Sequence, residues 1–194
     1  MRKSKKASTA GQNRGLIKNL VIIHDRPNEI ADRAIPCHWE GDMVSGSRNS
    51  HIALLVERKT WFLMLVRLNG KDALSVANAL LDGVNTLPVQ FRCSLTWDRD
   101  PEMAKHVTFT EATDMAVYFC DPQAPWQRGS NENTNGLLRQ CFPKGTNLRE
   151  YTQDDLDAIA GKLNGRSRKT LGLGTPADML YEASVATASP IFCR

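Results

Sequence analysis

The chain has 194 residues, of which 41% are hydrophobic and 24% charged, a composition typical of a globular domain. No apolar run approaches the roughly 18 residues that a membrane-spanning helix needs. The best candidate, 61–66, is far too short, and the amino terminus lacks the apolar segment of a secretory signal. These features exclude a membrane protein and favour a cytoplasmic one.

The net charge of +4 is unevenly distributed. Six basic residues and no acid crowd the first twenty positions: Arg2, Lys3, Lys5, Lys6, Arg14 and Lys18. A basic arm of this kind neutralises nucleic-acid phosphates in some proteins and is only a solubilising tail in others. The sequence leaves both interpretations open.

Cysteine usage argues against a zinc site or a disulfide framework. The five cysteines are Cys37, Cys93, Cys120, Cys141 and Cys193. Their number is odd, no two are close in sequence, and no histidine completes a ligand spacing. We therefore predict reduced thiols, as in cytosolic proteins.

Composition and turn signals divide the chain into three parts. Residues 1–36 are predicted to be a basic arm or linker, 37–185 a compact core, and 186–194 a tail. Within the core, apolar and β-branched runs predict strands at 39–44, 51–58, 61–68, 94–97 and 115–120. Helical spacing and capping residues predict helices at 72–87, 102–113, 131–141, 152–163 and 176–182.

This order of elements indicates an α/β domain. The first three strands form an antiparallel group, because only Lys59 and Thr60 separate the second from the third. Later strands alternate with helices and so add parallel partners. The sequence thus predicts a mixed sheet with helices on both faces, compatible with a ribonuclease-H-like fold.

Two aspartates stand at positions where α/β sheets place their active sites. Asp42 follows Gly41 in or at the end of the first strand, and Asp98 comes just past the apolar end of a later one. Carboxylates that converge from separate elements bind the divalent metals used in phosphoryl chemistry. Other acids, Glu102, Asp114 and Asp121, are interpreted as surface carboxylates.

The third candidate carboxylate is Glu132. It lies in the first turn of a helix that Ser130 is predicted to cap, among asparagine, threonine and glycine residues that form helices poorly. Local rules are most often broken at functional sites. Arg139 lies seven positions further on, on the same helical face, where it would hold a DNA phosphate.

Aromatic residues and one histidine have simpler interpretations. Trp39, Trp61 and Trp97 occupy strand-like runs and are predicted to be buried. Trp126 in a proline-flanked turn is more consistent with packing than with stacking on a base. His38 is predicted to be a structural hydrogen-bonding residue.

Three blocks of sequence resemble the catalytic blocks of insertion-sequence-thirty-type transposases, which belong to a larger group that includes retroviral integrases. The blocks are HWEGD at 38–42, TWDR at 96–99 and PWQRGSNEN at 125–133. Connecting stretches at 55–59, 135–140, 142–146 and 168–172 are also similar to this family. The resemblance extends over roughly residues 24–182.

The resemblance implies a ribonuclease-H-like integrase core with Asp42, Asp98 and Glu132 as catalytic triad. It further implies metal-dependent DNA cleavage and strand transfer, with two Mg2+ ions, or Mn2+ in their place, held by the three acids. One ion would activate a water or a DNA 3′-hydroxyl, and the other would stabilise the leaving oxygen. DNA would be the partner, with a possible homo-oligomer and a bacterial, nucleoid-associated location.

Supporting DNA contacts are expected from Arg128, Arg139 and Lys144 to phosphates, and from Trp126 to an unpaired base.

Two departures from the family pattern stand out. Asp100-Pro101 follows Asp98-Arg99 where the family usually has glycine, and glycine permits backbone angles that these residues resist. No helix-turn-helix pattern precedes the core, which suggests a shortened copy.

Three other functions remain open at this stage. A truncated remnant would bind DNA or a full-length transposase without catalysing anything. A simple nuclease of the same fold would cut without joining. An interaction module would form mixed multimers with a full-length transposase and inhibit it.

Overall fold

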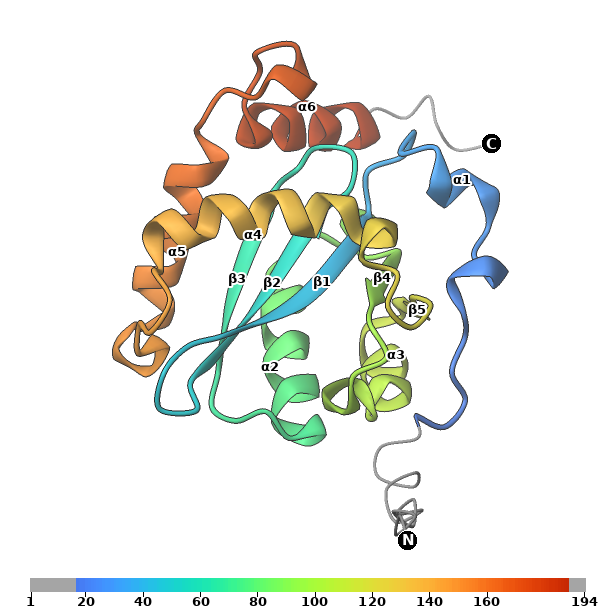
Figure 1. Cartoon of the computed structure of the whole chain (residues 1–194). Coiled ribbons are helices and arrows are strands. Elements are labelled where there is room, and N and C mark those ends of the chain that lie inside the picture. The colour runs from blue at the N-terminus through green and yellow to red at the C-terminus, as the bar shows by residue number, and fades with distance from the viewer. Residues whose placement is uncertain (1–16, 189–194) are drawn as a thin grey trace, which may run out of the picture.

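The computed structural model describes residues 17–188 (Figure 1). Most of the basic cluster, Arg2 to Arg14, lies outside the described residues, as do 189–194 of the predicted tail. No helix within the described range is long and apolar enough to cross a bilayer.

A five-stranded mixed sheet forms the centre of the fold. Its strands are β1 His38–Ser45, β2 His51–Glu57, β3 Leu63–Leu68, β4 Ser94–Trp97 and β5 Ala116–Phe119. They lie in the order β3-β2-β1-β4-β5, with β1, β2 and β3 antiparallel and β1, β4 and β5 parallel. The mixed sheet predicted from the sequence is confirmed.

Helices cover both faces of the sheet, as predicted. α2 Ala73–Asn85 and α3 His106–Thr113 pack on one face, and α4 Gly129–Cys141 and α5 Gln153–Asn164 on the other (Figure 1). Every residue of β2 is consequently buried, which explains its nearly continuous apolar run. The remaining α-helices are the short α1 Asn28–Ala31 and the carboxyl-terminal α6 Pro176–Ala188.

Capping residues account for several helix starts. The Asp72 side chain accepts a hydrogen bond from Ser75 N at 3.0 Å, and Thr152 forms a reciprocal capping box with Asp155. One predicted cap is wrong: α4 already begins at Gly129, and Ser130 lies buried inside its first turn. The α3 helix also begins later than predicted, at His106, after a 3-10 turn over Pro101–Met103.

Part of the predicted arm lies against the domain. Ile17, Ile23 and Ile30 are buried, and Ile22 forms an isolated parallel bridge with Phe119 of β5. The segment thereby covers the outer edge of the sheet beside β5. A covered edge is protected from pairing with other chains.

The pairing of β1 with β4 has a fixed offset of 56 residues, His38 opposite Ser94 and Glu40 opposite Thr96. One position before this ladder, Cys37 and Cys93 are joined by a disulfide with a Cα–Cα distance of 5.1 Å. The expectation of reduced thiols is therefore wrong for this pair. Sequence separation concealed the contact, because only strand register brings these cysteines together.

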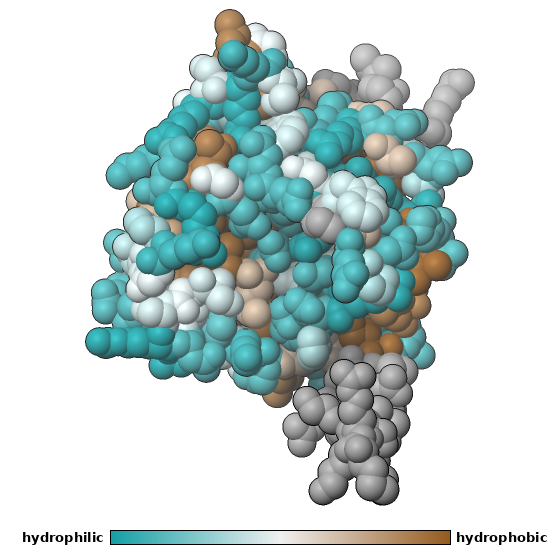
Figure 2. All heavy atoms as spheres, in the orientation of Figure 1, coloured by the Kyte–Doolittle hydropathy of each residue, from teal (hydrophilic) through white to brown (hydrophobic). Residues whose placement is uncertain are grey.

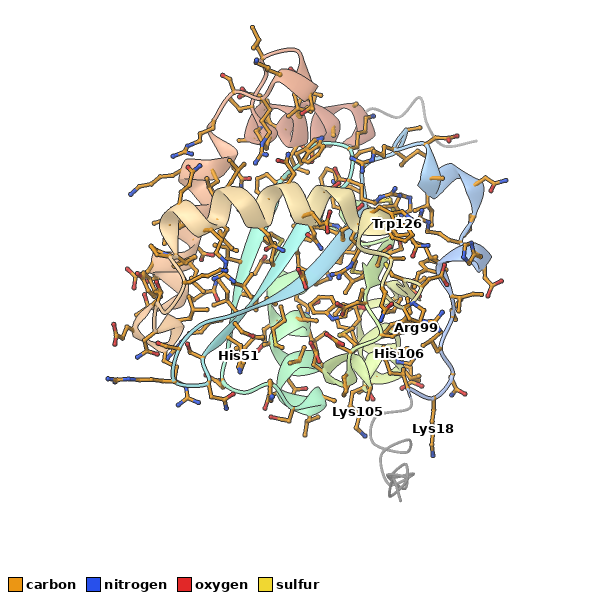
Figure 3. All side chains as sticks on the ribbon, in the orientation of Figure 1. Lys18, His51, Arg99, Lys105, His106 and Trp126 are labelled. Atoms are coloured by element: carbon orange, nitrogen blue, oxygen red, sulfur yellow. A yellow bond between two sulfur atoms is a disulfide. The ribbon has the colours of Figure 1, made fainter. Side chains whose placement is uncertain are left out.

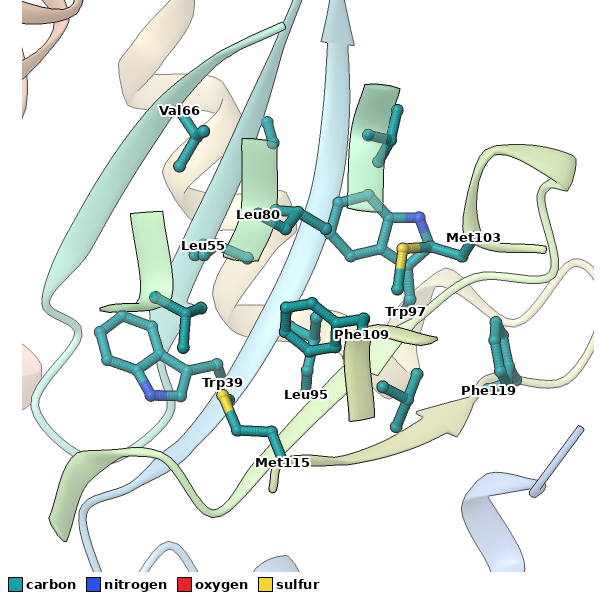
Figure 4. Packing of buried hydrophobic residues seen from close by; sticks show 14 of the residues in the cluster. Trp39, Leu55, Val66, Leu80, Leu95, Trp97, Met103, Phe109, Met115 and Phe119 are labelled. Atoms are coloured by element: carbon teal, nitrogen blue, oxygen red, sulfur yellow. The ribbon is translucent and has the colours of Figure 1, made fainter. Parts of the chain in front are cut away.

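The larger core cluster lies between the sheet and α2 and α3 (Figure 4). Trp39 and Trp97 are fully buried in it, as predicted, whereas Trp61 lies half-buried in the β2–β3 turn beneath the guanidinium groups of Arg33 and Arg168. Gly41 lies directly against the Trp97 ring. A Cβ atom at position 41 would lie 2.1 Å from Trp97 Cε3. This contact requires glycine beside Asp42.

Gly41→Ala is expected to lower the free energy of unfolding by about 1–3 kcal/mol, because the added methyl overpacks the Trp97 ring. Urea unfolding monitored by tryptophan fluorescence measures the change. Gly161→Ala in α5 is the control: its Cβ meets nothing within 4 Å, so the substitution should stabilise by about 0.5–1 kcal/mol. Equal stability of Gly41→Ala and the parent would contradict the packing.

Candidate active site

Strand register brings Asp42 and Asp98 together. Asp42 follows His38 on β1 by four residues, and Asp98 follows Ser94 of β4 by four residues. Because His38 pairs with Ser94, the two aspartates come to lie beside each other. Adjacent strands are about 4.8 Å apart. On β1, the alternation of side chains directs Glu40, Asp42 and Val44 toward the face covered by α4.

Arg128 connects the two aspartates. Its Nη1 lies 3.2 Å from Asp42 Oδ1 and donates to Gly41 O at 2.9 Å, and its Nη2 donates to Asp98 Oδ2 at 2.9 Å. The Arg128 side chain is only 12% exposed. A cation therefore bridges the two carboxylates, where their mutual repulsion would otherwise be strongest.

Glu132 lies on α4, close along the helix to both residues that contact Asp42. It follows Arg128 by four positions and precedes Asn135 by three, and Asn135 Nδ2 donates to Asp42 Oδ2 at 2.7 Å. Asn135 shares a helical face with Glu132 at this spacing, whereas Arg128 is the N-cap residue just before the helix. Glu132 itself is exposed, and within the described residues the carboxylates of Asp42, Asp98 and Glu132 do not all lie within 4.8 Å of one another.

The start of α4 is held by a residue that the sequence analysis did not single out. Glu40 is fully buried, and its Oε2 accepts hydrogen bonds from Ser130 N at 2.9 Å and Asn131 N at 3.2 Å. Its Oε1 accepts from Arg58 Nε at 3.0 Å. Glu40 precedes Asp42 by two positions, so strand alternation alone would have placed it on the same face.

Burial raises the pKa of Asp98 to about 6, although the positive charge of Arg128 opposes this shift. Asp100 and Asp42 raise it further. One oxygen of Asp98 is buried and accepts no hydrogen bond from the described residues. The hydrogen bonds and charges around Asp98 therefore do not fully offset the cost of removing its ionised carboxylate from water.

Asp98 also belongs to a second acidic group. Oxygens of Asp98, Asp100 and Glu102 lie within 4.8 Å of one another. Glu102 is buried, and burial raises its pKa, so its interpretation as a surface carboxylate is wrong. A cavity of about 430 Å³ adjoins Asp100 and Glu102. A larger hollow, about 1020 Å³ between α2, α5 and β3, contains none of these acids.

The Asp100-Pro101 sequence does not pull Asp98 out of register. Asp100 has extended backbone angles, φ −82° and ψ 146°, and Pro101 starts a 3-10 turn at a position that suits proline. The loop therefore follows a path that needs no glycine. Arg99 donates from Nε to Cys120 O at 2.8 Å and from Nη2 to Asp121 Oδ1 at 3.4 Å.

The other predicted contact residues remain at the surface. Arg139 and Lys144 are exposed, the first late in α4 and the second in the loop after it. Trp126 is 74% exposed beside the start of α4 (Figure 3), so it does not pack in the interior. Hydrophilic residues predominate on this side of the molecule (Figure 2).

His38, as predicted, is buried and hydrogen-bonded, with Nδ1 2.8 Å from Ser94 Oγ.

Comparison of the sequence with known proteins gives long matches. The chain is 54% identical to the transposase InsI of insertion sequence element IS30A from Escherichia coli (strain K12), over 171 residues that cover 88% of this chain and 45% of that protein. It is 47% identical to the transposase of insertion sequence element IS1086 from Cupriavidus metallidurans, covering 90% of this chain and 52% of that protein. No protein-family model matches the sequence.

The chain is homologous to the IS30-type transposases. A more distant relative, the transposase of IS4351 from Bacteroides fragilis, is 33% identical over 97% of the chain. The chain spans about half the length of the curated relatives it matches. The family resemblance seen in the three sequence blocks is thus confirmed.

Structural comparison supports the fold independently. The catalytic core domain of BIV integrase superposes with a TM-score of 0.59 at 17% identity, covering 79% of this chain and 99% of that structure. At this identity the likeness concerns the fold alone. The ribonuclease-H-like fold expected for this IS30-type homologue is confirmed.

The raised pKa of Asp98 predicts a pH-dependent stability. Between about pH 4, near the ordinary value of 3.8, and about pH 6, the folded state keeps a proton that the unfolded state has lost. The contribution of Asp98 to the free energy of unfolding should therefore fall as pH rises through this window, by about 3 kcal/mol at most. The buried His38, whose pKa is lowered to about 4, contributes an opposing rise over the same range, so the Asp98 effect is taken from the difference between the parent and a variant. Urea unfolding in EDTA at several pH values measures this fall.

In Asp98→Asn the same fall should be largely absent, because an amide does not titrate. The control Asp154→Asn removes an exposed carboxylate from the start of α5 and should retain the parent's profile. Identical profiles for the parent and Asp98→Asn would show that Asp98 does not titrate in this range.

Proposed function

We propose that this chain is the catalytic core of an IS30-type transposase that cleaves DNA and joins strands with the help of divalent metal ions. Asp42, Asp98 and Glu132 are the proposed ligands. The observation that carries the proposal is the convergence of Asp42 and Asp98 at neighbouring strands of an integrase-like sheet. The partner is proposed to be DNA, namely transposon ends and target.

The residues at the site suit a hard divalent cation. Every candidate ligand atom is a carboxylate oxygen, the type that Mg2+ and Mn2+ prefer. Such an ion would satisfy the buried Asp98 oxygen that has no hydrogen-bond donor, and so would offset the cost of its burial. Bound metal ions in such sites activate the attacking oxygen and stabilise the leaving one.

The protein's own residues supply position and charge. Asn135 holds the Asp42 carboxylate by one oxygen, and the β1–β4 ladder fixes Asp42 relative to Asp98. Glu132 approaches from α4, the helix that lies across this face of the sheet (Figure 1). Phosphoryl transfer needs little covalent chemistry from the enzyme, so fixed geometry is the main contribution.

Arg128 has a second proposed role. In the structure its guanidinium group neutralises Asp42 and Asp98, so it competes with a metal ion for the same oxygens. With a metal ion held by Asp42 and Asp98, the Arg128 guanidinium group would be available to a DNA phosphate. This role accounts both for the ion pairs of Arg128 in the structure and for its predicted contact with a DNA phosphate. Arg139 and Lys144 remain proposed phosphate contacts, and Trp126 a proposed base contact.

A catalytically inactive DNA-binding chain is the second candidate function. The observation that favours it is the exposed Glu132, which in the described structure does not join Asp42 and Asp98 in a group of carboxylates within 4.8 Å of one another. An inactive chain would bind DNA or a full-length transposase through its surface. A strand-transfer assay separates the two candidates, because only an active core yields joined products.

Asp98→Asn and Glu132→Gln are each expected to reduce Mg2+- or Mn2+-dependent cleavage and joining to background, because each removes a charged metal ligand. The assay uses pre-cleaved oligonucleotide ends and a plasmid target, with joined and merely nicked products separated on a gel. Asp154→Asn, far from the site, should retain the parent's activity. Full activity of Asp98→Asn would contradict the assignment, and nicking without joining in the parent would identify a simple nuclease.

Arg128→Met should bind Mn2+ several-fold more tightly than the parent, because a competing cation is lost. The same variant should be less stable than the parent in EDTA, since Asp42 and Asp98 then repel each other without compensation. Calorimetric titration and urea unfolding measure the two effects. Weaker Mn2+ binding by Arg128→Met would show that the guanidinium group assists the metal site instead of competing with it.

A further inference from the structure

We infer that Glu40 is the positioning residue that sets Glu132 relative to Asp42 and Asp98. This inference rests on the proposed function, in which Glu132 is a metal ligand. Glu40 does not itself touch the reacting atoms. It acts through α4, and the argument begins with the way that helix starts.

The α4 helix lacks a cap of its own. The N-cap residue Arg128 makes no side-chain capping bond, and the side-chain polar atoms of Ser130 and Asn131 are buried without hydrogen-bond partners among residues 17–188. The first N–H groups of a helix have no partner within it. Here Glu40 Oε2 accepts from Ser130 N at 2.9 Å and from Asn131 N at 3.2 Å, so a carboxylate from the sheet provides the cap.

The two attachments of Glu40 link the elements that carry the proposed ligands. Glu40 lies two positions before Asp42 on the same face of β1, and the two N–H groups that it binds immediately precede Glu132 in α4. A negative charge at a helix start is also favoured by the helix dipole. The carboxylate therefore fixes where the first turn of α4 lies over β1.

Glu40 is itself held rigidly. Its side chain is 0% exposed, and Oε1 accepts from Arg58 Nε at 3.0 Å, with Arg33 Nη2 at 3.9 Å. Arg58 in turn donates to Ile30 O in the segment that precedes β1. A carboxylate with both oxygens occupied and no exposure has little freedom to move, which is what a positioning residue requires.

A matched control exists within the same chain. Glu57 is also a fully buried carboxylate, but its oxygens accept from Cys37 N just before β1 and from Lys59 N and Thr60 N in the β2–β3 turn, and not from α4. Glu40→Gln and Glu57→Gln therefore make the same chemical change at equal burial. Only Glu40→Gln takes the charged acceptor from the start of α4, because its single amide oxygen cannot accept from both α4 and Arg58.

The experiment compares these two variants with the parent and with Glu132→Gln. Amide hydrogen exchange should become faster at Ser130 and Asn131 in Glu40→Gln only. Mn2+ affinity measured by calorimetry should fall about tenfold in Glu40→Gln, as is usual when a residue that orients a ligand is changed, and should stay at the parent's value in Glu57→Gln. If Glu40→Gln does not fold, Glu40→Asp keeps the charge for Arg58 but shortens the reach toward α4, and the same outcomes apply to it.

Two failures can be told apart. If Glu132→Gln binds Mn2+ as tightly as the parent, then Glu132 is not a ligand and the proposed function fails. If Glu132→Gln weakens binding but Glu40→Gln weakens it no more than Glu57→Gln does, the proposed function stands and the role of Glu40 is overturned. Unchanged exchange at Ser130 and Asn131 in Glu40→Gln would also overturn it.

Discussion

The parallel ladder between β1 and β4 is the constraint on which the site depends. Its offset of 56 residues sets Asp42 beside Asp98 at one end and Cys37 beside Cys93 at the other. A shift of one residue would turn every side chain of a strand to the opposite face. Burial of Trp39 and Trp97 on the α2 side opposes such a shift, and so keeps the aspartates facing α4.

The electrostatics of the site follow from this proximity. Two carboxylates beside each other, partly removed from water, require positive charge. Arg128 supplies that charge in the structure, and burial nevertheless raises the pKa of Asp98 to about 6. Arg128 does not fully compensate the two carboxylates, because one Asp98 oxygen has no hydrogen-bond donor. This oxygen could accept a further cation, which is consistent with metal-dependent chemistry.

A different carboxylate shows how the fold uses buried charge structurally. Glu40 has its charge matched by Arg58 and by the amino end of α4. Glu57 performs a comparable task in the β2–β3 turn. In the described part of the chain, Glu40 is thus fully buried and hydrogen-bonded at both oxygens, whereas Asp98 is partly buried and keeps one oxygen without a hydrogen-bond donor.

Sequence patterns determined which elements form, because apolar periodicity and capping are local. The strand at 94–97 and the Thr152 capping box were predicted correctly, and the three sequence blocks identified the family. The predicted Ser130 cap failed because the true cap, Glu40, lies 90 residues earlier in the chain.

The contacts that make the site were decided only by the tertiary structure. The Arg128 ion pairs, the burial of Glu102 and the Cys37–Cys93 disulfide all join segments that the sequence keeps apart or shows as ordinary surface. Strand register and helix packing select such partners, and both are set by the whole buried core. Local sequence patterns therefore do not determine which distant residues become partners.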